Sequence, residues 1–430
     1  MVRRPFPRPG RLTATPLALL LCCVAAASAS AAGFDRTLHG GRATGQAGAR
    51  VAQAADPSAV RYNPAGIVMT EGWELEAGLD FSNATDEYGS ATAGGFRADH
   101  SIQFPPSVYL TWNGGGPWAF GLGVDTAAWY RVDFDPALFP ARFNNRVVDL
   151  ELWEVHPVVA YDLGGGYSLA GGLRYLFGTF EQGRNAAVSV TGTGGADFPA
   201  EILLDAETDV DGYGLDGAIQ FRSTVWGWGA TYRTGAEVDG NGEVRRAVRN
   251  GPGDPVAEAN LQGLLVSSGA HQSLDLPWEL AGGAWVAPYP ELRLELDLVW
   301  AGWSDFEQSF GPRPAGATTD VQRSGWDDTL SIRLGVEGDL TDDLALGAGV
   351  ALEPSPVPDN RVDPAFFRGD ATVYALGLSY SFPQLSFDLG YSFHDYDDRS
   401  VRGQEAGRPN VTGTYSGHEQ VWSVSARWRF

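Results

Sequence analysis

The chain closes with Glu419-Gln420-Val421-Trp422-Ser423-Val424-Ser425-Ala426-Arg427-Trp428-Arg429-Phe430. In a β-strand, successive side chains point to opposite faces. One face of this stretch is aromatic and aliphatic, and the other carries serine and arginine. A transmembrane β-barrel needs such a strand, because one face meets lipid and the other a wet or packed lumen. An edge strand of a soluble sandwich is the alternative that this segment alone leaves open.

The same two-residue period recurs along the chain, as in Trp73–Phe81, Leu292–Trp300, Leu330–Val336, Tyr374–Phe382 and Leu385–Phe393. Each pattern is about ten residues long, the length that a tilted strand needs to cross a bilayer. The pattern predicts fourteen strands, at 73–83, 101–113, 117–126, 150–163, 166–181, 210–222, 225–234, 276–287, 291–303, 328–338, 343–353, 371–382, 385–396 and 419–430.

The connections between these predicted strands alternate between long and short. Short ones include 114–116, 164–166, 288–290 and 383–384, and long ones include 127–149, 182–209, 235–275, 304–327 and 397–417. Outer-membrane barrels show this asymmetry, with short periplasmic turns and long extracellular loops. We therefore expect an all-β fold, an up-and-down antiparallel transmembrane barrel of residues 73–430.

The first 31 residues read as an export signal. Four arginines precede the apolar run Leu17–Ala27, and Ala29-Ser30-Ala31 offers a cleavage site. The run is too short to span a bilayer as a helix. Both cysteines, Cys22 and Cys23, lie within this segment, so we expect neither disulfides nor thiolate metal sites in the mature chain.

Charge and composition fit an exported barrel. The 430 residues include 30 basic residues, all of them arginine, and 53 acidic residues, a net charge of −23. Four of the arginines fall in the signal, which leaves −27 for the remainder. So acidic a chain disfavours nucleic-acid binding. The acidic residues suit solvated loops and a polar lumen.

Residues 32–72 break the strand pattern, being rich in alanine and glycine. A barrel of about fourteen strands has an interior too wide for its own side chains to fill. We expect these residues to form a plug in the lumen rather than a dangling tail.

This segment contains Ala54-Ala55-Asp56-Pro57-Ser58-Ala59-Val60-Arg61-Tyr62-Asn63-Pro64-Ala65-Gly66. It resembles the N-terminal hatch of the outer-membrane long-chain fatty-acid and hydrocarbon transporters of the FadL/TodX type. Two further stretches are similar to that family, Trp303–Phe306 and Glu353–Asp359. The layout of signal, hatch, about fourteen strands and a terminal phenylalanine also resembles that family.

The resemblance implies passive uptake of hydrophobic molecules across the bacterial outer membrane. Fatty acids or hydrocarbons would be captured at extracellular loops, held behind the hatch and released sideways through the wall. It also implies a monomer without cofactor, whose partners are outer-membrane lipid and the barrel-assembly machinery, the latter contacting the strand that ends at Phe430.

Candidate site residues follow with alternatives open. Asn63, Pro64, Ala65 and Gly66 would shape the hatch, or form an ordinary turn. Apolar loop residues could capture ligand or pack together, namely Phe34 near the mature start, Phe139 in 127–149, and Leu261, Leu264 and Leu265 in 235–275.

Three arginines at lumen-facing positions, Arg174, Arg293 and Arg333, could bind a carboxylate headgroup or pair with lumen acids. Prolines 105, 106 and 157 could mark a defect in the wall or a strand end.

Three rival functions remain. An enzyme needs a nucleophile or activated water beside histidine and acid, and the six histidines form no such motif, so we expect neither catalytic residues nor a metal site. A general diffusion porin for polar solutes is the closer rival, followed by an adhesin or structural barrel.

Overall fold

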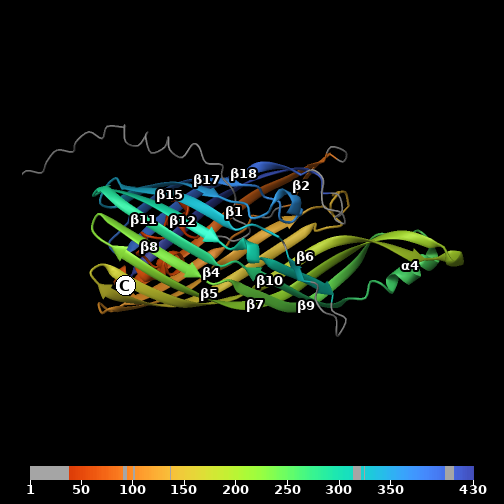
Figure 1. Cartoon of the computed structure of the whole chain (residues 1–430), viewed down its shortest axis with the longest axis horizontal. Coiled ribbons are helices and arrows are strands. Elements are labelled where there is room, and N and C mark those ends of the chain that lie inside the picture. The colour runs from red at the N-terminus through yellow and green to blue at the C-terminus, as the bar shows by residue number, and fades with distance from the viewer. Residues whose placement is uncertain are drawn as a thin grey trace, which may run out of the picture.

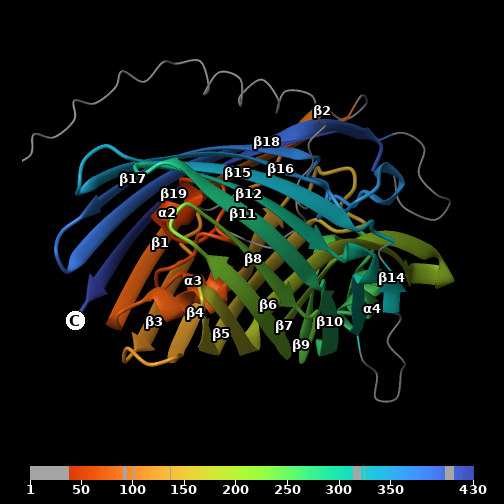
Figure 2. The same cartoon turned by 60° about the vertical axis from the view of Figure 1, so that its left-hand side comes forward.

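An antiparallel sheet of nineteen strand segments closes on itself, because β1 pairs with β19 from Glu74↔Arg429 to Gly89↔Thr414. The computed structural model describes residues 38–90, 94–99, 102–135, 137–312, 321–323, 325–401 and 411–430. The result is a barrel (Figure 1), which encloses the two short helices α2 (Gly41–Thr44) and α3 (Ala59–Tyr62) (Figure 2).

In the first half of the sheet the segments are β1 (Gly72–Ser90), β2 (Gly94–Arg97), β3 (Pro106–Asn113), β4 (Trp118–Asp133), β5 (Val147–Gly164), β6 (Tyr167–Thr191), β7 (Asp197–Arg222), β8 (Trp226–Arg233) and β9 (Ala236–Asn250). In the second half they are β10 (Ser268–Leu276), β11 (Glu279–Tyr289), β12 (Leu292–Ala301), β13 (Glu307–Pro312), β14 (Val321–Arg323), β15 (Thr329–Asp339), β16 (Leu344–Glu353), β17 (Ala371–Ser381), β18 (Leu385–Val401) and β19 (Gly413–Arg429).

Ten of these segments are halves of five interrupted strands, β2/β3, β8/β9, β10/β11, β12/β13 and β14/β15, so fourteen strands surround the lumen. The fourteen predicted strands are confirmed one for one. The helical segments are α2 (Gly41–Thr44), α3 (Ala59–Tyr62), η1 (Pro64–Met69), η2 (Thr193–Gly195), α4 (Pro255–Gln262), η3 (Trp303–Asp305) and η4 (Asp359–Arg361). Among the described residues, no helix has both the length and the apolar character needed to cross a bilayer.

The burial of β12 illustrates the inverted amphipathicity of the wall. Leu296, Leu298 and Trp300 are exposed on the outer face, whereas Glu295 and Asp297 are buried on the inner face. Apolar side chains on the outside and polar side chains on the inside are favourable when the barrel is surrounded by the hydrocarbon of a membrane.

Aromatic side chains form two belts on the outer face. Near the short turns, Trp118 contacts Tyr161 and Tyr167 contacts Phe221. Nearer the long loops, Tyr391 contacts Trp422. Amphipathic rings collect at the two membrane interfaces, so the belts mark where the barrel crosses the bilayer.

Strands on one side of the barrel are longer than the sequence predicts. Residues 182–209 and 235–275, expected to be loops, contribute the outer ends of β6 and β7, all of β9 and most of β10. We call residues 184–206 and 244–267 the arm; with α4 it projects from the end opposite the C-terminus (Figure 1). The outer face of the arm is polar. The sequence there lacks the apolar residue at every second position on which the strand prediction depended.

Candidate functional site

Residues 38–71, which we call the plug, lie inside the barrel. From residue 38 to residue 70, every side chain is buried except those of Arg42, Ala55, Val68 and Met69. The plug contacts strands from β1 to β19, and α2 lies against β17, β18 and β19.

Glycines let the plug backbone lie directly on the wall. Four of them form two register pairs, Gly335↔Gly349 across β15 and β16 and Gly377↔Gly390 across β17 and β18, the second pair offset by two residues from the first. We call these four the glycine trench. A β-carbon built on Gly349 would lie 2.3 Å from the Gln46 carbonyl carbon, and one on Gly390 would lie 2.3 Å from the Gly41 oxygen. No larger residue fits there without moving the plug.

Two wall carboxylates hold the middle of the plug by its backbone. Asp297 accepts a hydrogen bond from the Val51 amide at 2.9 Å, and Glu295 accepts one from the Ala52 amide at 2.6 Å. From β7, Gln220 donates to the Ala52 carbonyl at 2.9 Å. Buried backbone groups that lack secondary-structure partners are thereby satisfied.

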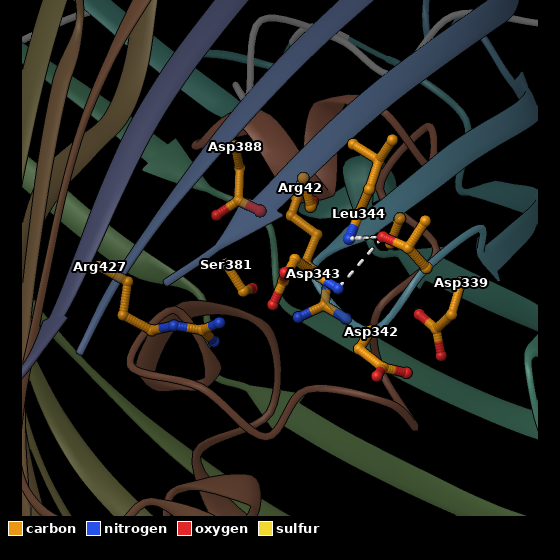
Figure 3. Close-up of a pocket in the computed structure, with 11 residues that line it drawn as sticks. Arg42, Asp339, Asp342, Asp343, Leu344, Ser381, Asp388 and Arg427 are labelled. Carbon is orange, nitrogen blue, oxygen red and sulfur yellow. Dashed lines mark hydrogen bonds between the residues drawn. The ribbon is translucent and has the colours of Figure 1, made fainter. Parts of the chain in front are cut away.

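Ion pairs hold the start of the plug. The Arg42 guanidinium donates two hydrogen bonds to Glu337, of 2.7 and 2.5 Å, and Arg50 donates to Asp56 at 2.6 Å. Below them a polar pocket of about 80 Å³ opens toward the short-turn end. Figure 3 shows Arg42, Arg427 and Asp388 among its lining residues.

The predicted hatch residues form a turn within the plug. The Asn63 side chain accepts a hydrogen bond from the Ala65 amide at 3.1 Å and donates to the Val51 carbonyl at 2.7 Å. Pro64 begins η1, where its missing N–H costs nothing. A β-carbon on Gly66 would lie 2.0 Å from the Ala54 oxygen. Asn63 therefore ties the turn at residues 63–66 to the plug backbone at Val51.

The wall is incompletely paired between β3 and β4. Their ladder ends at Val108↔Val124, and the next backbone bond from the second strand to β4 runs from Asp99 to Asp133. Between these points, the described residues make no backbone hydrogen bond across the seam. We call this stretch the wall gap; Pro105 and Pro106 adjoin it. Pro157, by contrast, lies within the paired ladder of β4 and β5, opposite Leu122.

The β4 side of the wall gap carries a bulge between Thr126 and Ala128. At this point the plug residue His39 meets the wall. Its Nδ1 lies 3.0 Å from Asp80 Oδ2 and its Nε2 lies 2.8 Å from the Thr126 carbonyl oxygen. His39 and Asp80 are both buried.

The loop end of the lumen is filled by an apolar cluster, which we call the outer cluster. Wall residues such as Leu150, Leu152 and Val238 contribute to it. The loops add aromatic rings: Phe134 stacks on Phe139 with centroids 4.1 Å apart, and Trp303 and Trp326 also belong to it. The described parts of these loops, which carry Phe134, Phe139, Trp303 and Trp326, thus fold inward over the mouth, as does loop 354–370.

Loop 354–370 is anchored by two guanidiniums, that of Arg399 in β18, which donates to Asp359 at 2.7 Å and to the Val357 carbonyl at 2.5 Å, and that of its own Arg368. Arg368 donates to Asp86, at 2.9 Å in the shortest contact, and to Glu419 at 3.3 Å, and it lies 5.1 Å from the ring centres of Tyr130 and Tyr396. The Asp86 side chain is fully buried. These contacts bring Phe366 and Phe367 of the same loop into the outer cluster.

Two of the candidate loop residues are buried, as in the alternative in which they pack together. Phe139 is fully buried in the outer cluster, and Leu261 is buried where α4 packs on the arm. Leu264 is exposed, with 47% of its surface accessible, and Leu265 is partly buried. Phe139 and Leu261 both lie in long connections, and nothing in the sequence indicated that these connections form hydrophobic cores of their own. Phe34 lies outside the described residues.

The three candidate arginines face the lumen, and each is engaged by a carboxylate. Arg174 donates to Glu154 at 2.7 Å, Arg293 to Asp339 at 2.9 Å, and Arg333 lies 3.3 Å from Glu353. The arrangement matches the alternative of lumen ion pairs. Sequence reasoning missed His39, whose isolated position gave no signal; Glu295 and Asp297 were visible only as lumen-facing acids in a strand.

The chain is similar to known proteins over nearly all of its length. Residues 22–430 match the family model described as outer membrane protein transport protein (OMPP1/FadL/TodX). A long-chain fatty acid transport protein of Escherichia coli O6:H1 is 25% identical over 223 residues, 50% of this chain and 49% of the relative. Alkane uptake protein A of Marinobacter nauticus is 25% identical over 48% of this chain and 46% of the relative. The chain thus spans about half the length of the curated relatives it matches.

Solved structures share the fold. A Pseudomonas aeruginosa FadL homologue superposes with a TM-score of 0.80 at 19% identity, covering 92% of this chain and 99% of the homologue. The Pseudomonas putida toluene transporter TodX superposes with a TM-score of 0.70 at 15% identity, covering 92% and 99% respectively.

Proposed function

Because the chain belongs to the OMPP1/FadL/TodX family of outer membrane transport proteins, we propose that it is a passive channel for hydrophobic molecules. Long-chain fatty acids and aliphatic or aromatic hydrocarbons are the proposed substrates. The names of the relatives, which include long-chain fatty acid transport and alkane uptake, support this class.

The contents of the lumen carry the proposal. Its loop end holds the apolar outer cluster, and its short-turn end holds the buried plug with its ion pairs. An apolar solute gains about 0.8 kcal/mol per methylene on leaving water, so the outer cluster would accept it and the charged plug would not. A general diffusion porin would instead need a continuous aqueous path, and an adhesin or structural barrel would have no use for an inward-facing apolar cluster.

The proposed route begins at the loops. Exposed apolar residues of the arm, Leu264 and Val266 with Leu265 beside them, would capture the solute. Transient opening of the inward-folded loops would admit it to the outer cluster, where Phe139 packs. The plug, acting as a hatch, would then turn it sideways through the wall gap into the membrane.

A fatty-acid headgroup could bind one of three lumen arginines, Arg174, Arg293 and Arg333. The substrate carboxylate would then have to displace the acidic side chain that now pairs with that arginine. In the proposed mature protein, residues 1–31 have been removed, residues 32–72 form the hatch, and residues 73–430 form the barrel. It would act as a monomer, without cofactor and without enzymatic activity, in a family whose members are transport proteins. Outer-membrane lipid would surround it, and the barrel-assembly machinery would receive the strand ending at Phe430.

Uptake by intact cells tests the proposal. A host lacking endogenous hydrophobic uptake would express wild type, Asn63→Ala in the plug turn, or Asn83→Ala on the outward face of β1 as a matched control. Labelled oleate, toluene and a disaccharide would be supplied, with uptake normalised to folded barrel.

We expect uptake of oleate or toluene without the sugar. Loss of the Asn63 hydrogen bonds should change hydrophobic uptake several-fold, whereas Asn83→Ala should match wild type. Sugar uptake by wild type would establish a porin and overturn the proposal. A barrel that takes up none of the three solutes would indicate a structural role.

A further inference from the structure

The polar pocket below the plug contains a buried carboxylate without a partner. Asp388 of β18 lines this pocket, and only 5% of its surface is accessible. Its side chain makes no hydrogen bond or ion pair with any other residue that the structure describes. Figure 3 shows Asp388 at the wall of the pocket with its carboxylate directed inward. An ionised carboxylate withdrawn from bulk water is costly unless it is paired, so this pocket lacks a cation.

The two arginines that line the pocket are engaged by other carboxylates. Arg42 donates two hydrogen bonds to Glu337, at 2.7 and 2.5 Å. The Nη1 of Arg427 lies 3.6 Å from Asp56, which Arg42 also approaches at 3.6 Å. Neither guanidinium forms an ion pair with Asp388 in the described part of the chain, so the positive charge nearest to this carboxylate is directed elsewhere.

The rim of the pocket adds further negative charge. Asp339 lines it but already accepts a hydrogen bond from Arg293 at 2.9 Å. Asp342 and Asp343 lie in the short turn 340–343 and are exposed, and their carboxylates have no partner among the described residues. Four aspartates and two arginines give the lining a formal charge of −2. The pocket therefore attracts a cation from the short-turn end, the end expected to face the periplasm.

The size and the neutral groups of the pocket indicate which kind of cation fits. Its volume is about 80 Å³, and a single water needs about 10–15 Å³ of such space, so a polar headgroup of several atoms can enter. Ser379, which pairs with Asp388 across β17 and β18, places a hydroxyl in the lining beside the carboxylate. A primary ammonium carries three N–H donors and no acceptor, and its hydrogen bonds to a carboxylate are charge-assisted and strong.

We propose that this pocket is a binding site for a primary ammonium cation. Asp388 pairs with the ammonium at the inner end of the pocket, Ser379 accepts one of its hydrogen bonds, and Asp342 and Asp343 attract it at the rim. A free diamine and a lysine side chain of another polypeptide offer the same chemistry. The pocket lies apart from the outer cluster and the wall gap, so binding here does not depend on the proposed transport route.

The experiment is isothermal titration calorimetry of the purified barrel in detergent. Putrescine represents the free diamine, Nα-acetyl-lysinamide represents the lysine side chain, and 1,4-butanediol is the uncharged analogue of putrescine. The residues that the structure describes include no cluster of three acidic, histidine or cysteine side chains placed to hold a metal ion, and MgCl₂ serves as the metal control.

Three variants with nearly unchanged shape locate the site. Asp388→Asn removes the inner charge, and Asp343→Asn removes one at the exposed rim, where packing is not at stake. Asp162→Asn is the matched control, because Asp162 is an exposed acid beside another short turn at the same end. Its contact there, a hydrogen bond accepted from the Gly164 amide, can be kept by an asparagine oxygen.

We expect saturable binding of one ammonium per wild-type barrel, weakened by added salt, and no binding of butanediol. Affinity should fall about tenfold or more in Asp388→Asn, fall several-fold in Asp343→Asn, and stay unchanged in Asp162→Asn. Tighter binding of putrescine would identify a free diamine as the ligand, and tighter binding of the lysine derivative a polypeptide.

Three results would overturn the proposal: no saturable binding of either ammonium, equal affinity in wild type and folded Asp388→Asn, or displacement of the ammonium by an equal concentration of Mg²⁺. If Asp388→Asn did not fold, the comparison of Asp343→Asn with Asp162→Asn would decide, and equal affinities there would also overturn it.

Discussion

At the scale of single residues, Arg368 shows how one buried charge pair contributes to holding a loop. Its guanidinium neutralises Asp86, which is fully buried. Replacing Arg368 by alanine should leave that carboxylate without a counter-charge and destabilise the barrel by about 3–5 kcal/mol. Lysine should restore part of this, because its point charge cannot bridge several partners at once.

Thermal unfolding in detergent would check the Arg368 prediction. The matched control is Arg245→Ala, whose pair with Glu207 is largely exposed, 69% and 49% by side chain; an exposed pair contributes at most about 1 kcal/mol. If the two variants melted together, the anchoring role of Arg368 would be untenable.

A second residue-scale prediction concerns Asp254, the N-cap of α4. Its carboxylate accepts hydrogen bonds from Thr193, and from the Ala257 and Val256 amides, which lower the pKa of Asp254 below its usual range. A lowered folded-state pKa means that its contribution to stability is present above the unfolded-state value, about 3.9, and is lost as pH falls through the folded value. The hydrogen-exchange protection factors of residues 255–262, which are measured relative to the intrinsic exchange rate at each pH, should therefore fall on acidification in wild type, and should already be low at neutral pH in Asp254→Ala. Equal protection of α4 in both proteins at neutral pH would contradict this.

Individual side chains also show where sequence reasoning succeeds. Alternation placed Arg174, Arg293 and Arg333 on the lumen side, and the structure finds all three there, because strand parity is fixed by the backbone. Alternation cannot say which partner each reaches, since partners such as Glu154 and Glu353 depend on the register between strands. His39 was missed for the same reason: its partners are 41 and 87 residues away.

At the scale of elements, the glycine trench makes a sharp prediction. Gly349→Ala should clash with the Gln46 carbonyl and lift α2, costing about 1–3 kcal/mol as overpacking does. Gly282 in β11 offers the control, because a β-carbon there would meet nothing within 4 Å. Ion conductance in planar bilayers would report a displaced plug. Conductance should rise for Gly349→Ala and stay at the wild-type level for Gly282→Ala; equal values would mean that the trench does not seat the plug.

The strands were predictable where one face of a strand meets lipid and the other face meets the lumen. Patterns such as Leu292–Trp300 located strands because lipid and lumen select opposite side chains. The outer ends of β6, β7 and β9 have water on their outer side, so the contrast disappears and the strands read as loops. Four of the five interruptions were likewise invisible, since a break such as that between β12 and β13 depends on the local fold of η3 rather than on polarity. The break between β2 and β3 was signalled by Pro105 and Pro106.

At the scale of the molecule, barrel and plug make separable contributions. The wall closes through its own β1–β19 ladder and does not need residues 38–70 for any strand pairing. Deleting residues 38–70 should therefore leave a folded barrel, recognised by its heat-modifiable mobility in gels, with a lumen open to a disaccharide. A deleted form that fails to fold would show that the plug is part of the barrel's folding core; a folded form impermeable to the sugar would show that the outer cluster alone seals it.

The pairing of the first and last strands also has a consequence for the order of assembly. One edge of β1 pairs with β2 and β3, and the other edge pairs with β19. The β1–β19 seam joins the first and last strands, so it has the greatest separation along the chain and costs the most loop entropy to form. The plug contacts strands on both sides of it, β1 through His39 and β19 through Gly41 and Thr44. The docking of the plug and the pairing of β1 with β19 are therefore coupled, and both come late in folding. A chain stalled before β19 would leave β1 as an open edge with its hydrogen-bonding groups unpaired, so quality control that recognises such edges would have this seam as its natural checkpoint.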